Sequence, residues 1–175
     1  MHHSKRLAAG LIAAVLALSA CGGAPGVLES ATQVIDAFEA RGHRCVERFD
    51  DPGEEGEGFV IDQVSECELA SGEILYAYSF PTAADRRAGT AVNVAGDCLV
   101  PDRVGVQYVF AELWIVISDE GYTDLDYSLV PLTEVVGGDV HAVDCAAARA
   151  RTAGLEVGVT PPAQYADAVL GDGEG

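Results

Sequence analysis

The chain has 175 residues and a strong excess of acidic side chains, with 28 Asp and Glu against 10 Lys and Arg and a net charge of −18. An acidic surface of this kind repels nucleic-acid phosphates, which excludes a nucleic-acid partner, and favours cations and basic partners. Lys5 is the only lysine, so the body of the chain offers neither a P-loop lysine nor a Schiff-base lysine.

The first twenty residues have the layout of an export signal. Lys5 and Arg6 form a positive start, and residues 7–18 form an apolar run that is followed by small residues. This run is too short to cross a bilayer, since a spanning helix needs about 20 apolar residues. The stretch Leu18-Ser19-Ala20-Cys21 resembles the bacterial lipobox, in which the cysteine thiol receives a diacylglycerol and the signal is cut just before it.

We therefore expect a lipoprotein signal peptide at 1–20, a lipid on Cys21 and a flexible glycine-rich tether over 21–29. Two acyl chains anchor a protein stably, so the expected location is the outer face of the cell membrane. The alternative is a plain secretory signal that ends near a cysteine. From Cys21 onward, eight arginines stand against the 28 acidic residues, and the net charge is −20.

The first half of the mature chain predicts a helix and three strands. A capping box at Ser30 to Gln33 and apolar residues at helical spacing predict a helix over 31–41. Strands are predicted over 43–49, 59–69 and 74–80, and an acidic loop over 50–58 separates the first two. Alternation in the second strand places five residues on one face, namely Phe59, Ile61, Ser65, Cys67 and Leu69. The three segments are typical of an antiparallel meander.

The second half predicts a longer helix, a hairpin and a short helix. The longer helix begins at Pro81-Thr82 and ends at Gly96, and its inner face consists of small residues, namely Ala84, Ala88, Ala91, Val92 and Ala95. A hairpin is predicted over 104–118. A short helix from about 128 to 136 ends at Gly137-Gly138, and a short strand over 140–143 follows. The stretch AAARARTAG over 146–154 allows a few helical turns, and the low complexity of residues 146–175 as a whole predicts a disordered tail.

Together these elements predict a single α+β domain over 30–145. The expected architecture is an antiparallel sheet of about five to six strands with two or three helices packed on one face.

The cysteines predict two disulfides once Cys21 is assigned to the lipid. Cys45, Cys67, Cys98 and Cys145 remain, and four cysteines allow three connectivities. If the first two strands pair around the acidic loop, Cys45 lies opposite Cys67, which leaves Cys98 for Cys145. A zinc site that combines His43 or His141 with these cysteines is the alternative. The chain has no C-x-x-C pair, and export favours disulfides, so neither a metal nor another cofactor is expected.

Motifs of catalysis are lacking in the sequence. Neither G-x-S-x-G nor H-E-x-x-H occurs, and the acidic loops lack the spacing of a calcium loop. A triad built on His43 or His141 stays open, because triads are spatial, but no residue is assigned a catalytic role. Four strand aromatics could line a ligand cleft, although such residues more often belong to a core. They are Tyr76, Tyr78, Tyr108 and Trp114.

The order of these features resembles that of small actinobacterial lipoproteins over residues 30 to 143. The matching features are Cys45 and Cys67, the segment from Ser79 to Arg86, Trp114, and Gly137-Gly138. The chain departs from that pattern at 110–113, where Ala-Glu stands in place of a Gly-Asp type of turn. The resemblance implies an exported α+β domain, and thus a location and a fold more than an activity.

These observations predict a non-catalytic envelope lipoprotein. Its membrane contact would be the lipid on Cys21, and it would bind a protein, a peptide or a cell-wall component through its sheet or its acidic loops. The alternative is a carrier or sensor of a small ligand in an aromatic-lined pocket, and an enzyme ranks last. The sequence specifies neither the individual partner nor the oligomeric state.

Overall fold

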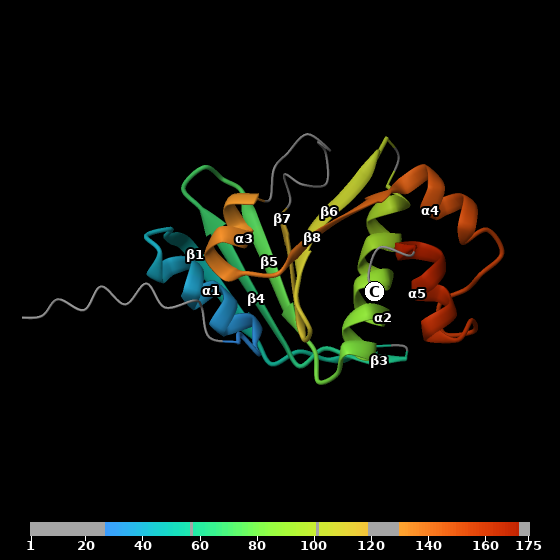
Figure 1. Ribbon diagram of the computed structural model, residues 1–175, viewed down its shortest axis with the longest axis horizontal. Coiled ribbons are helices and arrows are strands. Elements are labelled where there is room, and N and C mark those ends of the chain that lie inside the picture. The colour runs from blue at the N-terminus through green and yellow to red at the C-terminus, as the bar shows by residue number, and fades with distance from the viewer. Residues whose placement is uncertain (1–26, 57, 101, 119–129, 172–175) are drawn as a thin grey trace, which may run out of the picture.

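The computed structural model describes residues 27–56, 58–100, 102–118 and 130–171. The predicted signal peptide, Cys21 and most of the tether lie outside these residues. The described chain has an α+β fold, as predicted, with a six-stranded antiparallel sheet in the order β1-β4-β5-β7-β6-β8 (Figure 1). The strands are β1 Cys45–Asp51, β4 Gln63–Leu69, β5 Ile74–Ser79, β6 Gly105–Phe110, β7 Trp114–Ser118 and β8 Asp139–Asp144.

Helices cover both faces of this sheet. They are α1 Ala31–Ala40, α2 Ala83–Cys98, α3 Val130–Val136, α4 Cys145–Arg151 and α5 Pro162–Leu170. The trio α2, α4 and α5 packs on one face, while α1 and α3 pack on the other face (Figure 1). The sequence predicted α1, α2 and α3 on a single face, but the structure divides them between the two faces.

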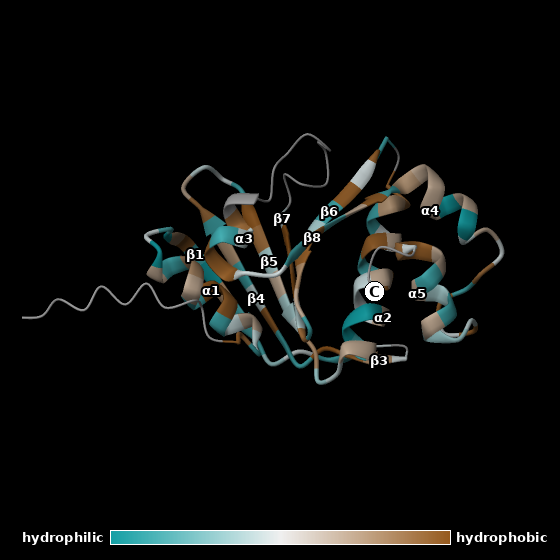
Figure 2. Ribbon diagram, viewed as in Figure 1, coloured by the Kyte–Doolittle hydropathy of each residue, from teal (hydrophilic) through white to brown (hydrophobic). Residues whose placement is uncertain are grey.

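The sequence of β7 accounts for this two-sided arrangement. All five of its residues are buried, because Ile115 and Ile117 join the core under α2 while Trp114 and Val116 join the core under α1. A continuous apolar run is typical of a strand that is covered on both faces. Figure 2 shows apolar residues along the central strands and alternating apolar and polar stretches along α1.

The predicted meander forms in the order β1-β4-β5, but its second strand is shorter than predicted. Residues 59–69 divide into β3, Phe59–Val60, and β4, because the amide of Ile61 donates to Glu54 O and that of Asp62 donates to Ser79 O. Phe59 and Ile61 therefore pack under α2, whereas Cys67 packs under α1, and the predicted common face is wrong.

The predicted acidic loop contains a small hairpin. The strand β2, Glu55–Gly56, pairs with β3, and the connection from β1 into this hairpin requires glycine at residue 53. Gly53 has a φ of +80°, and a Cβ there would lie 2.3 Å from Ile61 O. The amide of Val60 donates to Asp85 Oδ1 at 3.1 Å, which ties this hairpin to the start of α2.

The helix α2 begins where predicted and runs two residues past Gly96. The side chain of Thr82 caps it by accepting from the amide of Asp85 at 3.0 Å. Its buried face contains Ala88, Ala91 and Val94, whereas Ala84 is exposed. At Gly89 an added Cβ would lie 2.5 Å from the ring of Phe80, so glycine allows this ring to approach the helix backbone.

The hairpin of β6 and β7 forms as predicted. The amide of Ala111 donates to Trp114 O at 3.0 Å, which leaves Glu112 and Leu113 at the tip. Arg86 fixes this tip, since its Nε donates to Glu112 O at 3.2 Å and its guanidinium lies 4.9 Å from the centre of the Phe110 ring.

The prediction of a disordered tail is wrong for residues 146–171. The helices α4 and α5 pack against each other and against α2, and Ala148, Ala166, Val169 and Leu170 are buried. Arg151 donates to the carbonyls of Ala168 and Val169 near the end of α5, at 2.7 and 3.0 Å. Such bonds satisfy carbonyls that a helix end leaves without partners. The domain therefore extends beyond the predicted boundary at 145.

None of the helices in the described part of the chain is long and apolar enough to cross a membrane.

Candidate binding site

Both predicted disulfides are present. Cys45 pairs with Cys67 between β1 and β4, and Cys98 pairs with Cys145 between the end of α2 and the start of α4. Because all four sulfurs are oxidised, none can ligate zinc as a thiolate, which overturns the alternative of a zinc site on these cysteines. The described residues contain no other group of three or more side chains suited to a metal ion.

The two histidines of that alternative have packing roles. The ring of His43 stacks on Phe38 with 4.2 Å between the ring centres. The Nε2 atom of His141 lies 3.1 Å from Leu170 O, and its ring packs against Tyr108. Both histidines therefore hold neighbouring elements together.

The four predicted ligand aromatics do not line one pocket. Trp114 is 2% exposed and belongs to the core under α1, whereas Tyr108 is 0% exposed and belongs to the core under α2. Strand alternation puts these two residues on opposite faces of the hairpin. Tyr76 and Tyr78 are half-buried and share the face that points toward the side of α2.

Tyr76 belongs to a row of side chains that crosses β1, β4 and β5, at the edge of the sheet formed by β1. Phe49 of β1 lies opposite Glu66 of β4, and Glu66 lies opposite Tyr76 of β5. Residues that are directly opposite on antiparallel strands have Cβ atoms about 4.5–5.5 Å apart. Phe49 is 56% exposed, although it is a large aromatic residue in a strand. We call Phe49, Glu66, Tyr76 and Tyr78 the aromatic–acidic face.

Carboxylates give this face a negative potential. The pKa of Tyr78 is raised to about 12. Burial is the largest cause, and the charges of Glu66, Tyr76 and Asp97 add to it. Two more acidic residues, Glu47 and Glu68, lie opposite each other on β1 and β4, two register positions from Phe49 and Glu66 and on the same face. The phenol of Tyr78 therefore stays neutral at physiological pH beside carboxylates that attract cations.

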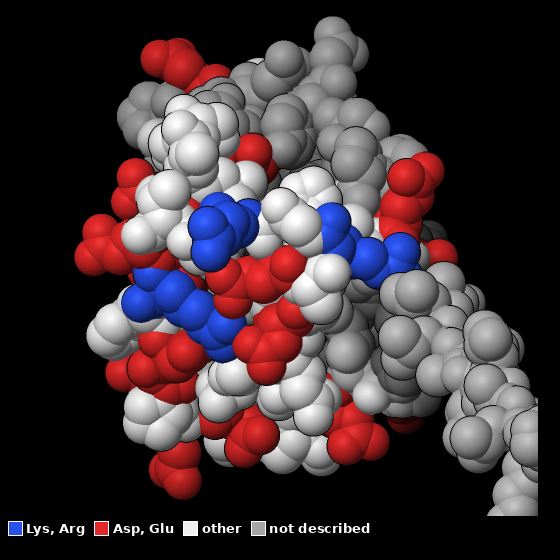
Figure 3. Space-filling model, turned by 90° about the vertical axis from the view of Figure 1, so that its left-hand side faces the viewer, with Lys and Arg blue, Asp and Glu red and all other residues white. Residues whose placement is uncertain are grey.

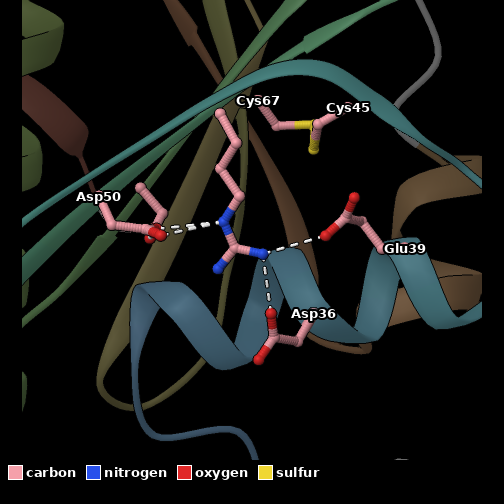
Figure 4. Close-up of a disulfide and its surroundings, with 7 residues drawn as sticks. Asp36, Glu39, Cys45, Asp50 and Cys67 are labelled. Atoms are coloured by element: carbon pink, nitrogen blue, oxygen red, sulfur yellow. Dashed lines mark hydrogen bonds and ion pairs between the residues drawn. A yellow bond between two sulfur atoms is a disulfide. The ribbon is translucent and has the colours of Figure 1, made fainter.

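The opposite side of β1 carries an ion network. Arg48 donates to Asp36 at 2.8 Å, to Glu39 at 3.0 Å and to Asp50 at 3.1 Å, beside the disulfide of Cys45 and Cys67 (Figure 4). Burial alone would lower the pKa of Arg48, but its hydrogen bonds to Asp36 and Asp50 raise it overall. One arginine thus joins α1 to β1 and pairs with three carboxylates, whose total charge it offsets in part.

The end of the molecule formed by α1 and β1 is rich in acidic side chains. Figure 3 shows these side chains spread over that end, with arginines between them. The carboxylates around Arg48 are already paired with this arginine, so we regard the Arg48 network as structural. The aromatic–acidic face is the better candidate for binding, because it combines carboxylates with accessible aromatic rings.

Sequence reasoning identified Tyr76 and Tyr78 as candidate binding residues, but it did not identify Phe49 and Glu66. The signal was present, because Glu66 directly precedes Cys67 and alternation along β4 puts these two residues on opposite faces. The strand pairing that puts Phe49 beside Glu66 required the structure.

No protein-family model matches this chain, and no curated protein or solved structure shows significant similarity to it.

Proposed function

We propose that this protein is an exported, membrane-anchored and non-catalytic binding protein that recognises a basic, extended segment of a partner protein or peptide on the aromatic–acidic face. The observation that carries the proposal is the row of Phe49, Glu66 and Tyr76 across three strands. A lysine or arginine side chain can lie against the aromatic rings and pair with the carboxylate between them. A net charge of −20 from Cys21 onward would attract such a partner from a distance.

The disulfides support a general location for the protein, but not its attachment to a membrane. Two disulfides indicate an oxidising location outside the cytoplasm, since thiols in the cytosol are kept reduced. The finer assignment to the outer face of the cell membrane rests on the lipobox at Cys21 and belongs to the proposal.

The alternative of a small-ligand carrier in an aromatic pocket has less support. Its pocket would have required Tyr108 and Trp114, and both are buried in separate cores. The aromatic–acidic face lies on the strands of the sheet and is not an enclosed pocket. It therefore suits an extended peptide better than a small molecule.

The first testable prediction concerns this face. The full chain should bind a fluorescent peptide of alternating Gly and Lys, and Glu66→Gln or Phe49→Ala should weaken binding about three- to tenfold, because each removes one half of a cation–π and charge pair. Fluorescence anisotropy at two salt concentrations measures the affinity.

The matched control is Glu112→Gln at the tip of the β6–β7 hairpin, which removes one exposed negative charge at a distance from the face. It should change the affinity less than twofold. Equal weakening by Glu66→Gln and Glu112→Gln would show general charge attraction without a site, and a Gly-Glu peptide that binds as well as the Gly-Lys peptide would overturn the proposal.

A further inference from the structure

A second surface with opposite chemistry lies between α2, α4 and α5. It is an open groove of about 420 Å³. Its lining is mostly apolar and consists of Ala95, Cys98, Leu99, Ala148, Arg149, Thr152, Ala153, Leu155, Val157, Tyr165 and Val169. The volume lies within the range of about 300–1,000 Å³ that small-molecule sites have. None of these residues belongs to the aromatic–acidic face.

The groove exposes large apolar side chains that the fold does not cover. Leu99 is 76% exposed, and Val157 on the opposite wall is also exposed. A much smaller hollow of about 10 Å³ shares Val157 and Tyr165 with the groove and lies beside α2 toward Phe59. A continuous apolar surface of this kind is typical of a binding groove.

The floor of the groove is rigid. It contains Cys98, whose disulfide to Cys145 fixes the end of α2 to the start of α4, together with the buried residues Ala148 and Val169. A site on locked elements is formed before a ligand arrives, so less entropy is lost on binding.

The charge in the groove contrasts with that of the rest of the molecule. Arg149 is the only charged residue among those that line it, in a chain with 28 acidic residues. One of its Nη1 hydrogens is donated to Cys98 O, which holds the guanidinium at the rim. A guanidinium has five N–H donors, so donors remain for a carboxylate, which arginine binds in a two-point geometry.

We propose that this groove binds a single-chain anionic amphiphile, namely a free fatty acid, with its acyl chain along the apolar wall of α2 and its carboxylate on Arg149. The apolar lining matches the acyl chain, and the lone positive charge matches the headgroup. A free fatty acid fits better than a two-chain membrane lipid, because a groove of about 420 Å³ has the size of a site for one small molecule.

The test uses the full chain with native disulfides and Cys21→Ala, which keeps the protein free of an acyl chain of its own. Dansylaminoundecanoic acid should bind saturably with one site per chain, and dodecanoic acid should displace it better than the uncharged dodecyl maltoside. Ala153→Trp should abolish binding, because Ala153 is an exposed lining residue and the indole ring would occupy the groove. Arg149→Gln should weaken binding about three- to fivefold.

The matched control is Arg44→Gln, which removes one exposed positive charge next to β1 and should leave the affinity unchanged. Thermal melting checks that each variant is folded. Absence of saturable binding to the native groove, or an affinity that Ala153→Trp leaves unchanged, would overturn the proposal. A concentration-dependent dimer that Ala153→Trp dissociates would assign the groove to a second copy of the chain and would equally overturn it.

Discussion

Tyr78 reports the electrostatics of the aromatic–acidic face at the scale of one residue. The pKa of its phenol is about 12 in the folded protein, above the ordinary value of 10.0, and burial is the largest cause. The folded state therefore holds this proton more tightly than the unfolded state. Its contribution to stability is fully present below pH 10 and is lost as the pH rises from 10 to about 12.

We therefore expect Tyr78→Phe to flatten the alkaline loss of stability. The native protein should lose about 2 kcal/mol of unfolding free energy through this phenol between pH 10 and 12, and the variant should not lose this part. Denaturant unfolding across that pH range measures the difference.

Tyr165→Phe is the matched control, because burial raises the pKa of Tyr165 as well, but only to a smaller extent. It should change the alkaline slope less than Tyr78→Phe does. Identical slopes in the native protein and in Tyr78→Phe would show that the folded protein does not raise the pKa of this phenol.

Residue patterns in the sequence predicted part of the candidate site. Alternation in β5 was sufficient to put Tyr76 and Tyr78 on one face. It could not place Tyr108 and Trp114 relative to each other, because the length of the hairpin turn decides which face each residue takes, and the turn sequence Ala-Glu gave no clear register. Their separation into two cores follows from the turn at Glu112 and Leu113.

At the scale of elements, each disulfide joins a different pair of secondary-structure elements, β1 with β4 and α2 with α4. The bridge from Cys45 to Cys67 spans 22 residues, and the bridge from Cys98 to Cys145 spans 47. Loop-closure entropy predicts that a longer closed loop restricts the unfolded chain more. Replacing both cysteines of a bridge by Ala should cost about 3 kcal/mol for the first pair and about 4 kcal/mol for the second.

Chemical denaturation of the two double variants measures both losses. The order of the two values tests the loop-entropy explanation, because the substitutions are the same and three of the four cysteines are buried, while Cys45 is half-buried. A larger loss for the pair Cys45 and Cys67 would mean that packing around β1 outweighs the length of the loop.

The helix α5 supplies another prediction at this scale. Val169 is fully buried against α2, so Val169→Ala should lower the unfolding free energy by about 1–3 kcal/mol through lost burial and a small cavity. Thermal or denaturant unfolding measures this loss.

Val159→Ala is the matched control, since Val159 is 76% exposed in the connection between α4 and α5. Its effect should stay within about 0.5 kcal/mol. Equal and negligible effects of both substitutions would contradict the packing of α5 and would restore the expectation of a disordered tail.

Sequence reasoning allowed a few helical turns where α4 forms, but it missed α5 and the packing of both helices for a physical reason. The stretch after residue 145 is rich in Ala and Gly, and α5 has nine residues with no side-chain cap at its start. Helices this short are marginal on their own, and tertiary packing stabilises them. In this protein α2 provides the packing surface, and Arg87 adds an ion pair of 2.8 Å to Asp167.

At the scale of the whole molecule, sequence patterns predicted the α+β class, the number of strands and both disulfides. These features follow from periodicity, turn residues and the count of cysteines. The second layer of helices was not predicted, because the apolar face of a helix does not specify which side of a sheet it will cover. The run of four apolar residues from Trp114 to Ile117 in β7 held that information.

The attachment of the whole molecule depends on one residue in our proposal. Cys21→Ala should move the protein from the membrane fraction to the soluble fraction of the envelope and abolish incorporation of labelled lipid, because the thiol that carries the diacylglycerol would be gone. Cell fractionation and metabolic labelling with a fatty acid measure both effects. Cys45→Ala is the control and should retain the label, and retention of the Cys21→Ala protein in the membrane would disprove the lipid anchor.

The pairing pattern has a consequence for the order of oxidation. Each bridge joins cysteines that are neighbours in the described chain, Cys45 with Cys67 and then Cys98 with Cys145, and the two bridges lie in different cores. A chain that emerges from a translocation channel with its N-terminus first presents Cys67 to Cys45 before Cys98 appears. If the chain is exported as we propose, oxidation in this order favours the native pairing over the two other connectivities of these four cysteines.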